Sequence, residues 1–172
     1  MNLLNLTAPV PINAAHKLTC FDSGEVFLDE WLKKRAIKNH ASGASRCFVL
    51  CAGDEVIGYY CLSAGAISHE TAPKAMRRNM PDPLPVLLLG RLAIDNRYQN
   101  QGLGRALLRD AMVRTVSVAG NTGVFALLVH AISDQAKRFY IGQGFVQSPL
   151  QPMTVMMTLE TIRSILSEPD GY

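Results

Sequence analysis

The residues best able to do chemistry form a glycine-bearing segment, in which Gln99, Gly102 and Gly104 follow an apolar run and open an amphipathic one. Glycine has no Cβ, so a ligand can approach the backbone closely there. Unpaired amides at the start of a helix, together with the positive end of its dipole, favour bound phosphate. The segment lacks the lysine of a P-loop and the glycine spacing of a dinucleotide fingerprint. It therefore predicts a phosphate-binding turn of another kind, with an ordinary strand–helix turn as the alternative.

Two basic clusters are the second distinctive feature. The chain has 17 Lys and Arg against 14 Asp and Glu, a net charge of +3 that does not by itself identify a nucleic-acid binder. The basic residues gather in two places, Lys33, Lys34, Arg35 and Lys38, and Lys74, Arg77 and Arg78. Such clusters either are solvated faces or bind phosphate groups.

The cysteines, Cys20, Cys47, Cys51 and Cys61, include no CxxC pair, and no histidine stands at metal-ligand spacing from them. Zinc binding or a disulfide would be the functional interpretation. The structural one, small buried apolar residues in a reducing cytoplasm, is favoured. We expect no metal.

The elements that position these residues begin with a helix that Asp22 or Ser23 can cap and Gly43 ends. Its expected apolar stripe consists of Val26, Phe27, Trp31, Leu32 and Ile37. A hairpin of strands over 47–52 and 56–67 follows, then a basic loop over 69–85 with a short helix around 73–80. The remaining elements are strand 86–94, helix 102–118, strand 124–130, a helix capped by Ser133, strand 153–159 and helix 160–166.

The length of 172 residues predicts one domain over residues 1–172, and 48% apolar residues suffice for one core. The element order implies an α/β sandwich on a mixed sheet. The longest apolar runs, 86–89 and 124–129, are shorter than the roughly 18 residues of a membrane helix. No basic n-region precedes the first apolar residues, so we expect a cytoplasmic protein without a secretory signal.

Two segments carry a family resemblance. Gln99-x-x-Gly102-x-Gly104, after an apolar strand, resembles the acetyl-CoA pyrophosphate loop of the GNAT acetyltransferases. Ala136-x-x-Phe139-Tyr140-x-x-x-Gly144-Phe145 resembles the family's second signature, at the family's spacing. The resemblance implies a GNAT fold over roughly residues 46–159: a mixed, mostly antiparallel central sheet with a splayed central strand pair, flanked by helices.

A narrower resemblance extends over nearly the whole chain. Phe21-x-Ser23-Gly24, Leu28-Asp29-x-Trp31-Leu32, Ala36-x-x-Asn39 and residues 90–95 resemble the GNAT branch that contains toxins of type II toxin–antitoxin pairs. Those toxins acetylate the α-amine of aminoacyl-tRNA and stop translation. The resemblance implies an aminoacyl-tRNA substrate, a ribbon-helix-helix antitoxin, operator DNA bound only through the antitoxin complex, and a homodimer without membrane association.

The family resemblance also implies where acetyl-CoA, the cosubstrate, would lie. The backbone of Leu92, Ala93 and Ile94 would contact pantetheine and the thioester, and a further contact is expected near Ser133, where the family often has asparagine. The amides that would bind the pyrophosphate belong to Gln99, Asn100, Gln101, Gly102, Leu103, Gly104 and Arg105.

Acetyl transfer needs a neutral amine near the thioester, a stabilised oxyanion and a proton for the departing thiolate. A backbone N–H around Leu92 would face the oxyanion. Tyr140, in the family's tyrosine position, is the expected general acid, and a helix tyrosine packed on the cofactor is the alternative. Strand 86–94 carries no carboxylate base. That absence fits an aminoacyl ester, whose amine titrates below about 7.7–8.0, better than a lysine near about 10.4.

Other candidates are less specific. His130 is the one base candidate, although a structural histidine is favoured. His16, His40 and His69 are expected on the surface, and the sequence identifies no partner for them. Arg91 would meet substrate phosphate, the cofactor or the antitoxin, or else face outward. The expected tRNA surface comprises Lys33, Lys34, Arg35, Lys38, Arg77, Arg78 and Arg91.

Two other functions remain open. One is a GNAT enzyme that acetylates a small amine or a protein amine. The other is a non-catalytic acyl-CoA-binding regulatory module, against which the intact Tyr140 and glycine loop argue.

Overall fold

The computed structural model describes residues 6–169. In chain order, its elements are β1 (Val10–Pro11), α1 (Val26–Ser42), β2 (Arg46–Ala52), β3 (Glu55–Ile67), η2 (His69–Thr71), α2 (Lys74–Arg77), β4 (Leu84–Ile94), η3 (Asn96–Tyr98), α3 (Leu103–Ala119), β5 (Ala126–His130), α4 (Asp134–Gly142), β6 (Val146–Gln147), β7 (Thr154–Thr158) and α5 (Leu159–Ser167).

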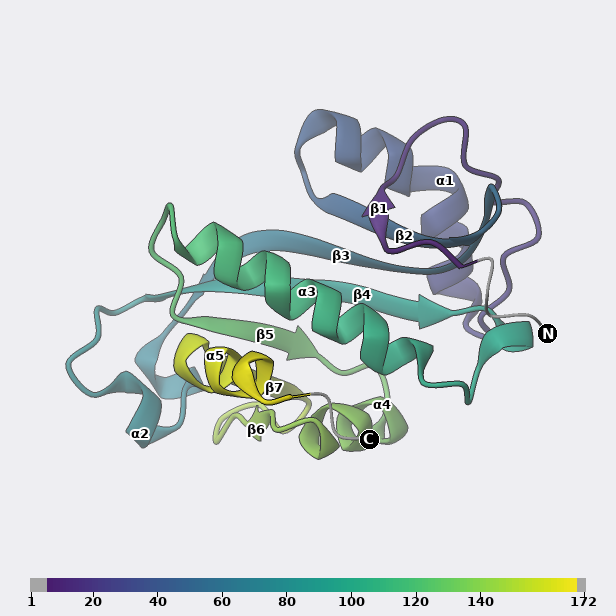
Figure 1. Ribbon diagram of the computed structural model, residues 1–172. Coiled ribbons are helices and arrows are strands. Elements are labelled where there is room, and N and C mark those ends of the chain that lie inside the picture. The colour runs from purple at the N-terminus through teal and green to yellow at the C-terminus, as the bar shows by residue number, and fades with distance from the viewer. Residues whose placement is uncertain (1–5, 170–172) are drawn as a thin grey trace. The chain divides into compact units, whose positions relative to one another are not determined.

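The strands form a seven-stranded mixed sheet in the order β1-β2-β3-β4-β5-β7-β6 (Figure 1). In the parallel pair β4–β5, Val86–Leu88 lies in register with Ala126–Leu128. The pairs β1–β2, β2–β3, β5–β7 and β6–β7 are antiparallel. The predicted α/β fold, a mixed and mostly antiparallel sheet with flanking helices, is confirmed. The contacts divide the chain into two compact units, residues 6–63 with 90–111 and residues 64–89 with 112–169.

In the first unit, α1 packs on the hairpin of β2 and β3 (Figure 1). Leu28, Leu32 and Ala36 of α1 are buried in one apolar cluster with residues of β2 and β3 and with Ala93. Gly43 ends the helix at φ 81° and its amide donates to the carbonyls of Asn39 and His40, as expected for a helix C-terminus. The hairpin and the helix end are therefore as the sequence predicts.

The start and the buried face of α1 differ from the prediction. The predicted caps, Asp22 and Ser23, do not occupy the N-cap position. Glu25 occupies it, and its side chain makes no capping hydrogen bond. The buried face includes Asp29, whose carboxylate accepts hydrogen bonds from the Ser23 hydroxyl, at 2.6 Å, and the Ser23 amide. Because that face is anchored through Asp29, Val26 and Phe27 point outward and are 71% and 54% exposed.

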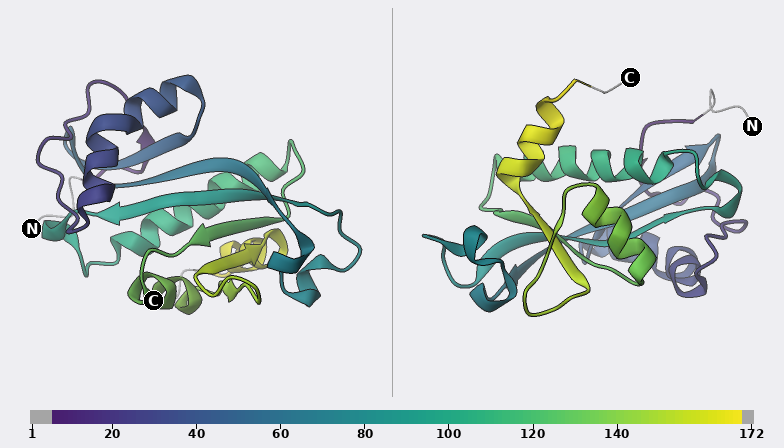
Figure 2. Two further views of the ribbon diagram at one scale, coloured as in Figure 1. Left: turned by 180° about the vertical axis from the view of Figure 1, so that it is seen from behind. Right: turned by 90° about the horizontal axis from the view of Figure 1, so that it is seen from below.

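The second unit has its own apolar core. Residues of β4, β5 and β7, among them Leu84, Leu128 and Met156, pack with Ala72. Figure 2 shows β7 running directly into α5. Thr158 caps α5, because its hydroxyl accepts from the Thr161 amide at 3.2 Å.

All four cysteines are free thiols. Cys47, Cys51 and Cys61 are buried in strands, as expected for small apolar core residues, whereas Cys20 is exposed and the expectation is wrong for it. Within residues 6–169, no group of three or more His, Cys, Asp or Glu side chains is placed to hold a metal ion. In the same range, every helix is too short or too polar to cross a bilayer.

Candidate functional site

The turn between β4 and α3 presents a row of free backbone amides. Among the described residues, none of the amides of residues 99–105 donates a hydrogen bond to the protein, and the Ala106 amide is the first to do so, to Gly102 at 3.2 Å. Asn100 and Gly102 adopt left-handed φ values of 62° and 79°, a conformation that favours glycine. A Cβ added at Gly102 would meet nothing within 4 Å. The turn therefore offers several donors to an oxygen-rich anion such as a phosphate.

A network of hydrogen bonds fixes this turn to neighbouring segments. The Gln99 side chain donates to the carbonyls of Ser23 and Ile94, both at 2.9 Å. The buried Asp95 carboxylate accepts from the amides of Asp22 and Arg97 and from the Arg97 guanidinium, which also pairs with Glu55 at 2.7 Å. Burial raises the pKa of Asp95, but the hydrogen bonds from Arg97 and the Asp22 amide outweigh it and hold the pKa below its ordinary value. The turn is thus tied to β4 and to the segment before α1.

The end of β4 brings the predicted thioester contacts into the same unit as the turn. Ala93 is buried, and Leu92 and Ile94 are half-buried. Ile94 and Leu107 of α3 pack close to the backbone of Gly58, where an added Cβ would lie 2.8 Å from Ile94 and 3.2 Å from Leu107. Gly58 therefore lets β3 approach the strand and the helix that flank the turn.

The Arg91 side chain contacts Trp31 of α1 and is not simply directed into solvent. Its guanidinium carbon sits 4.1 Å from the centroid of the Trp31 ring, a cation–π contact. Trp31 is in turn stacked on Tyr59, with ring centroids 6.1 Å apart. The Arg91 Nε is buried and has no hydrogen-bond partner among the described residues.

The first basic cluster lies on α1. Lys33, Lys34, Arg35 and Lys38 are all exposed. Lys34 pairs with Glu30 at 3.2 Å, an exposed pair that contributes little to stability. The helix therefore presents several cations to solvent in the same unit as the turn.

Tyr140 lies in the second unit, near the end of α4. It is 6% exposed and makes edge-on contacts with Phe139 and Phe145, at centroid distances of 5.1 and 5.4 Å. Burial raises the pKa of the phenol well above its ordinary value. Tyr140 therefore keeps its proton throughout the physiological range, as a general acid must.

Ser133 and His130 have structural partners in the same unit. The Ser133 hydroxyl accepts from the Ala136 amide at 3.1 Å and so caps α4, as the sequence predicts. His130 ends β5, and its Nδ1 lies 2.8 Å from the Thr154 hydroxyl across the β5–β7 pair. These contacts agree with the structural interpretation of His130.

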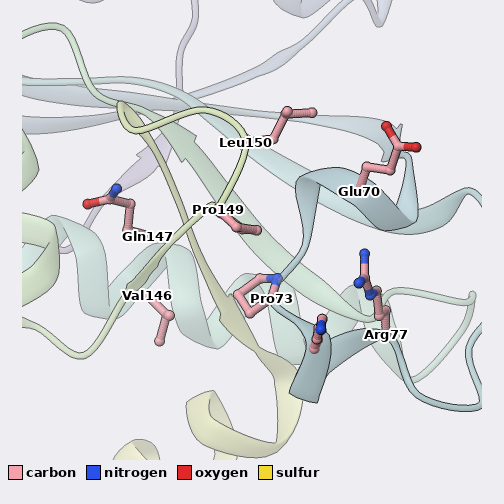
Figure 3. A pocket seen from close by; sticks show the side chains of 8 residues that line it. Glu70, Pro73, Arg77, Val146, Gln147, Pro149 and Leu150 are labelled. Carbon is pink, nitrogen blue, oxygen red and sulfur yellow. The ribbon is translucent and has the colours of Figure 1, made fainter.

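The second basic cluster borders a groove in the second unit. The groove has a volume of about 630 Å³ and is lined by Glu70, Pro73, Lys74, Arg77, Val146, Gln147, Pro149 and Leu150. Figure 3 shows that its side chains come from two segments, the one around α2 and the one made of β6 and the loop that follows it. The Arg77 guanidinium donates to the His69 carbonyl at 2.9 Å, whereas Arg78 is exposed.

Three histidines for which the sequence identifies no partner have one in the structure. His16 Nδ1 accepts from the Asn13 amide and His40 Nδ1 from the Cys47 amide, both at 3.0 Å, and His69 Nε2 lies 2.7 Å from the Pro81 carbonyl. Burial and the charge of Arg46 lower the pKa of His40. These partners are backbone groups of nearby turns and strand starts, which no spacing in the sequence reveals.

The structure thus groups the predicted residues into two sets. The first unit holds the phosphate-binding turn, Leu92–Ile94, Arg91 and the basic cluster of α1, and the second holds Tyr140, Ser133, His130, Arg77 and Arg78. The sequence prediction missed Asp22, Asp95 and Arg97, which shape the turn, and the contact between Trp31 and Arg91. Asp95 and Trp31 do belong to the segments that carry the narrower family resemblance. The resemblance therefore singles out these two residues, but it does not reveal which contacts they make.

A family model described as an acetyltransferase (GNAT) domain matches residues 43–147. The match covers both the turn after β4 and the segment around Tyr140. The chain therefore belongs to the GNAT acetyltransferases, and the family resemblance of these two segments is confirmed.

Individual relatives within this family are similar to the chain over nearly its whole length. The chain is 46% identical over 162 residues to a tRNA-acetylating toxin of Mycobacterium tuberculosis, covering 94% of this chain and 98% of that protein. A mutant of KacT superposes with a TM-score of 0.89 at 29% identity, and AtaT complexed with acetyl-methionyl-tRNAfMet with 0.87 at 28%; each match covers 94% of this chain and 99% of the other.

Further structures of these neighbours contain partners. A mutant AtaT toxin is bound to the C-terminus of the antitoxin AtaR and to acetyl-CoA, with a TM-score of 0.82 at 27% identity over 95% of this chain and 99% of that one. A complex of KacTA with DNA matches with a TM-score of 0.80 at 26% identity, over 95% and 99% of the two chains.

Proposed function

We propose that this chain is a toxin that transfers the acetyl group of acetyl-CoA to the α-amine of an aminoacyl-tRNA and so blocks translation. The observation that carries the proposal is the 46% identity, over nearly the full length of both chains, to a tRNA-acetylating toxin. The free amides of the turn after β4 and the buried, protonated Tyr140 supply the chemical groups that such a transfer needs.

The residues of the turn fit the pyrophosphate of acetyl-CoA. Seven consecutive amides, those of Gln99, Asn100, Gln101, Gly102, Leu103, Gly104 and Arg105, are without a protein acceptor in the described chain, and Gly102 leaves open space above the backbone. The exposed Arg105 adds a positive charge at the start of α3. When bound, acetyl-CoA supplies the activated acetyl group. We assign the backbone of Leu92, Ala93 and Ile94 to its pantetheine arm, and a further contact to the region of Ser133.

Tyr140 is the proposed general acid. Its raised pKa keeps the phenol protonated, so that it can give its proton to the departing thiolate. An amide near Leu92 would stabilise negative charge on the carbonyl oxygen. No carboxylate lies on residues 86–94, and the amine of an aminoacyl ester needs no strong base, because much of it is already neutral near pH 7. His130, bonded to Thr154, is not needed for this step.

The proposed tRNA surface consists of the two basic clusters and Arg91. Phosphate contacts give affinity without reading sequence, so this surface would hold the tRNA and leave the choice of amino acid to other groups. Its members are Lys33, Lys34, Arg35, Lys38, Arg77, Arg78 and Arg91.

We further propose that the chain is one acetyltransferase domain over residues 1–172, works as a homodimer in the cytoplasm and is neutralised by a ribbon-helix-helix antitoxin. It would reach operator DNA only in complex with that antitoxin. The relatives bound to an antitoxin C-terminus and to DNA support an antitoxin partner and a DNA-bound complex.

The proposal is tested by offering labelled acetyl-CoA with charged and uncharged bulk tRNA separately. Label is expected on charged tRNA alone. Label on neither, with acetyl-CoA binding intact, would contradict the proposal and favour a small-amine or protein acetyltransferase. Acetyl-CoA binding without transfer to any amine would favour a regulatory module.

A further inference from the structure

We propose, resting on the function above, that one face of α1 together with Arg91 binds the unpaired 3′ end of charged tRNA, with a base stacked on Phe27 and a phosphate on Arg91. The residues of this face are Phe27, Trp31, Lys34, Arg35 and Lys38. They and Arg91 belong to the first unit of the fold, which also carries the phosphate-binding turn.

The spacing of these residues places them on one side of the helix. Trp31 follows Phe27 by four residues, Lys34 and Arg35 follow Trp31 by three and four, and Lys38 follows Lys34 by four. Residues three and four apart lie above one another on a helix surface. The buried face, Leu28, Asp29, Leu32 and Ala36, is a different one, so this side remains available.

Phe27 is an aromatic side chain that the fold leaves uncovered. It is 54% exposed although it lies in the first turn of the helix that packs on the first core, and it takes no part in that core. A ring in such a position offers a stacking face to a base, and cations at its side hold the backbone that carries the base. Aromatic rings interleaved with Lys and Arg are typical of proteins that bind single-stranded RNA.

Arg91 adds an oriented cation with unused donors. Its guanidinium rests on Trp31, and among residues 6–169 it makes no ion pair or hydrogen bond. Its Nε is buried without a partner, which costs free energy unless an acceptor arrives. By contrast, Arg97 in the same unit already satisfies two carboxylates. Guanidinium groups favour phosphate oxygens, with which they form paired hydrogen bonds.

The neighbouring backbone leaves room for such a ligand. Gly90, which precedes Arg91 on β4, is exposed, and a Cβ added there would meet nothing within 4 Å. Arg91 also stands next to Leu92–Ile94, the segment assigned to the thioester. A phosphate on Arg91 would therefore deliver the amino acid at the end of the tRNA to the region where transfer occurs.

Trp31 is the single tryptophan of the chain, which gives this face its own spectroscopic signal. The experiment titrates the full chain with a single-stranded RNA that ends in CCA, and with a duplex RNA of equal length, while affinity is followed by anisotropy and Trp31 by fluorescence. The single strand is expected to bind more tightly and to change the Trp31 emission. Equal affinity for the duplex, or binding without a change in emission, would overturn the proposal.

Variants assign the two contacts. Phe27→Ala is expected to weaken binding of the single strand by about 5- to 100-fold, as loss of one stacked base does. Val26→Ala is the matched control, because Val26 is 71% exposed on the same helix but lies off this face. Equal losses in the two variants would contradict the stacking role.

Arg91→Met keeps an unbranched side chain over Trp31 but removes the charge. The slope of log affinity against log salt should fall in magnitude by about 0.7, the value for one phosphate of a single strand. Arg91→Lys should retain the slope and lose affinity, because lysine lacks the planar fork. An unchanged slope in Arg91→Met, with acetyl-CoA binding intact as evidence of folding, would overturn the phosphate contact. Normal labelling of charged tRNA by the wild-type chain in that case would leave the proposed function standing.

Discussion

Two side chains show how environment decides chemistry at the scale of single residues. Tyr140 is surrounded by Phe139 and Phe145, so burial keeps its phenol protonated. Asp95 is equally buried, but hydrogen bonds from Arg97 and the Asp22 amide keep its carboxylate charged. The phenol of Tyr140 therefore keeps its proton, and the charged carboxylate of Asp95 accepts the hydrogen bonds that hold the turn.

Tyr140→Phe should preserve the ring and its packing while removing the acidic proton. Transfer to charged tRNA is expected to slow by about 10²- to 10⁴-fold, the usual contribution of general acid catalysis, with the Kd of acetyl-CoA unchanged. Because the pKa of Tyr140 is raised, the wild-type rate should rise as the substrate amine deprotonates and then stay level to about pH 10.

Single-turnover rates of the wild type and of Tyr140→Phe across pH 6 to 10 check both expectations, with Tyr98→Phe as the control that removes another phenol. A full rate in Tyr140→Phe would show that this hydroxyl is not the acid. A fall in the wild-type rate near pH 8 would show that the phenol titrates in the range where burial should prevent it.

At the scale of elements, the sequence predicts most helices and strands but misplaces one face. Long apolar strands and glycine-ended helices carry clear periodic signals, so β2, β3, β4 and α3 lie close to their predicted ranges. β1 and β6 have two residues each, too few for any periodicity. The buried face of α1 differs from the predicted one because it includes an aspartate, Asp29, which is hydrogen-bonded to Ser23 of the preceding loop.

The candidate site was predictable to a similar extent. The glycines of the turn and Tyr140 each belong to a sequence motif, and the two motifs together rarely occur in one chain by chance. The turn is supported by Asp22, Asp95 and Arg97. Folding brings Asp22 and Asp95 together, although more than 70 residues separate them in the sequence. Such contacts between distant segments are not encoded in local spacing.

Gly102→Ala tests the turn itself. A non-glycine residue at φ 79° is strained by about 1–2 kcal/mol, while open space around the added Cβ excludes a clash. If the strain is relieved by a shift of the turn, the Kd of acetyl-CoA should rise about 5- to 30-fold in isothermal titration. Gly123→Ala, where no positive φ is needed and an added Cβ also meets nothing within 4 Å, serves as the control. Unchanged binding in Gly102→Ala would place the pyrophosphate elsewhere.

Asp95→Asn tests the support of the turn. Loss of the charged acceptor should reduce the free energy of unfolding by about 2 kcal/mol at pH 7, as for a hydrogen bond to a charged group. Because the folded pKa of Asp95 is lowered, its stabilisation is present above the unfolded value of about 3.9 and is lost as the pH falls through the folded value. Urea unfolding measured from pH 7 to pH 3 should therefore show that the free energy of unfolding falls less with decreasing pH in the variant than in the wild type. Parallel wild-type and variant curves would contradict this linkage.

At the scale of the whole molecule, charge placement matters more than net charge. A net charge of +3 is modest, but the clusters on α1 and beside the groove in the second unit gather cations on two separate segments. Arg77 is anchored on the His69 carbonyl, so part of that cluster also shapes the local fold. Affinity for a polyanion should thus depend on both clusters.

Reversing the charge of Arg77 and Arg78 to Glu should weaken tRNA binding and reduce its salt dependence, with the KM for acetyl-CoA unchanged. Arg163→Glu is the control, since Arg163 is exposed on α5 outside both clusters. Binding of tRNA measured at several salt concentrations distinguishes the cases. If the double variant binds with the wild-type slope, the second cluster is a solvated face.

The most direct test of the central claim identifies the acetylated atom. After reaction of the chain with acetyl-CoA and bulk charged tRNA, mild base cleaves the aminoacyl ester, and mass spectrometry identifies the released amino acids. We predict at least one amino acid released as its N-acetyl derivative, with the remaining tRNA unmodified. Unmodified amino acids together with an acetyl group on the RNA, or no acetylated product from charged tRNA at all, would contradict the assignment of this chain as an aminoacyl-tRNA acetyltransferase.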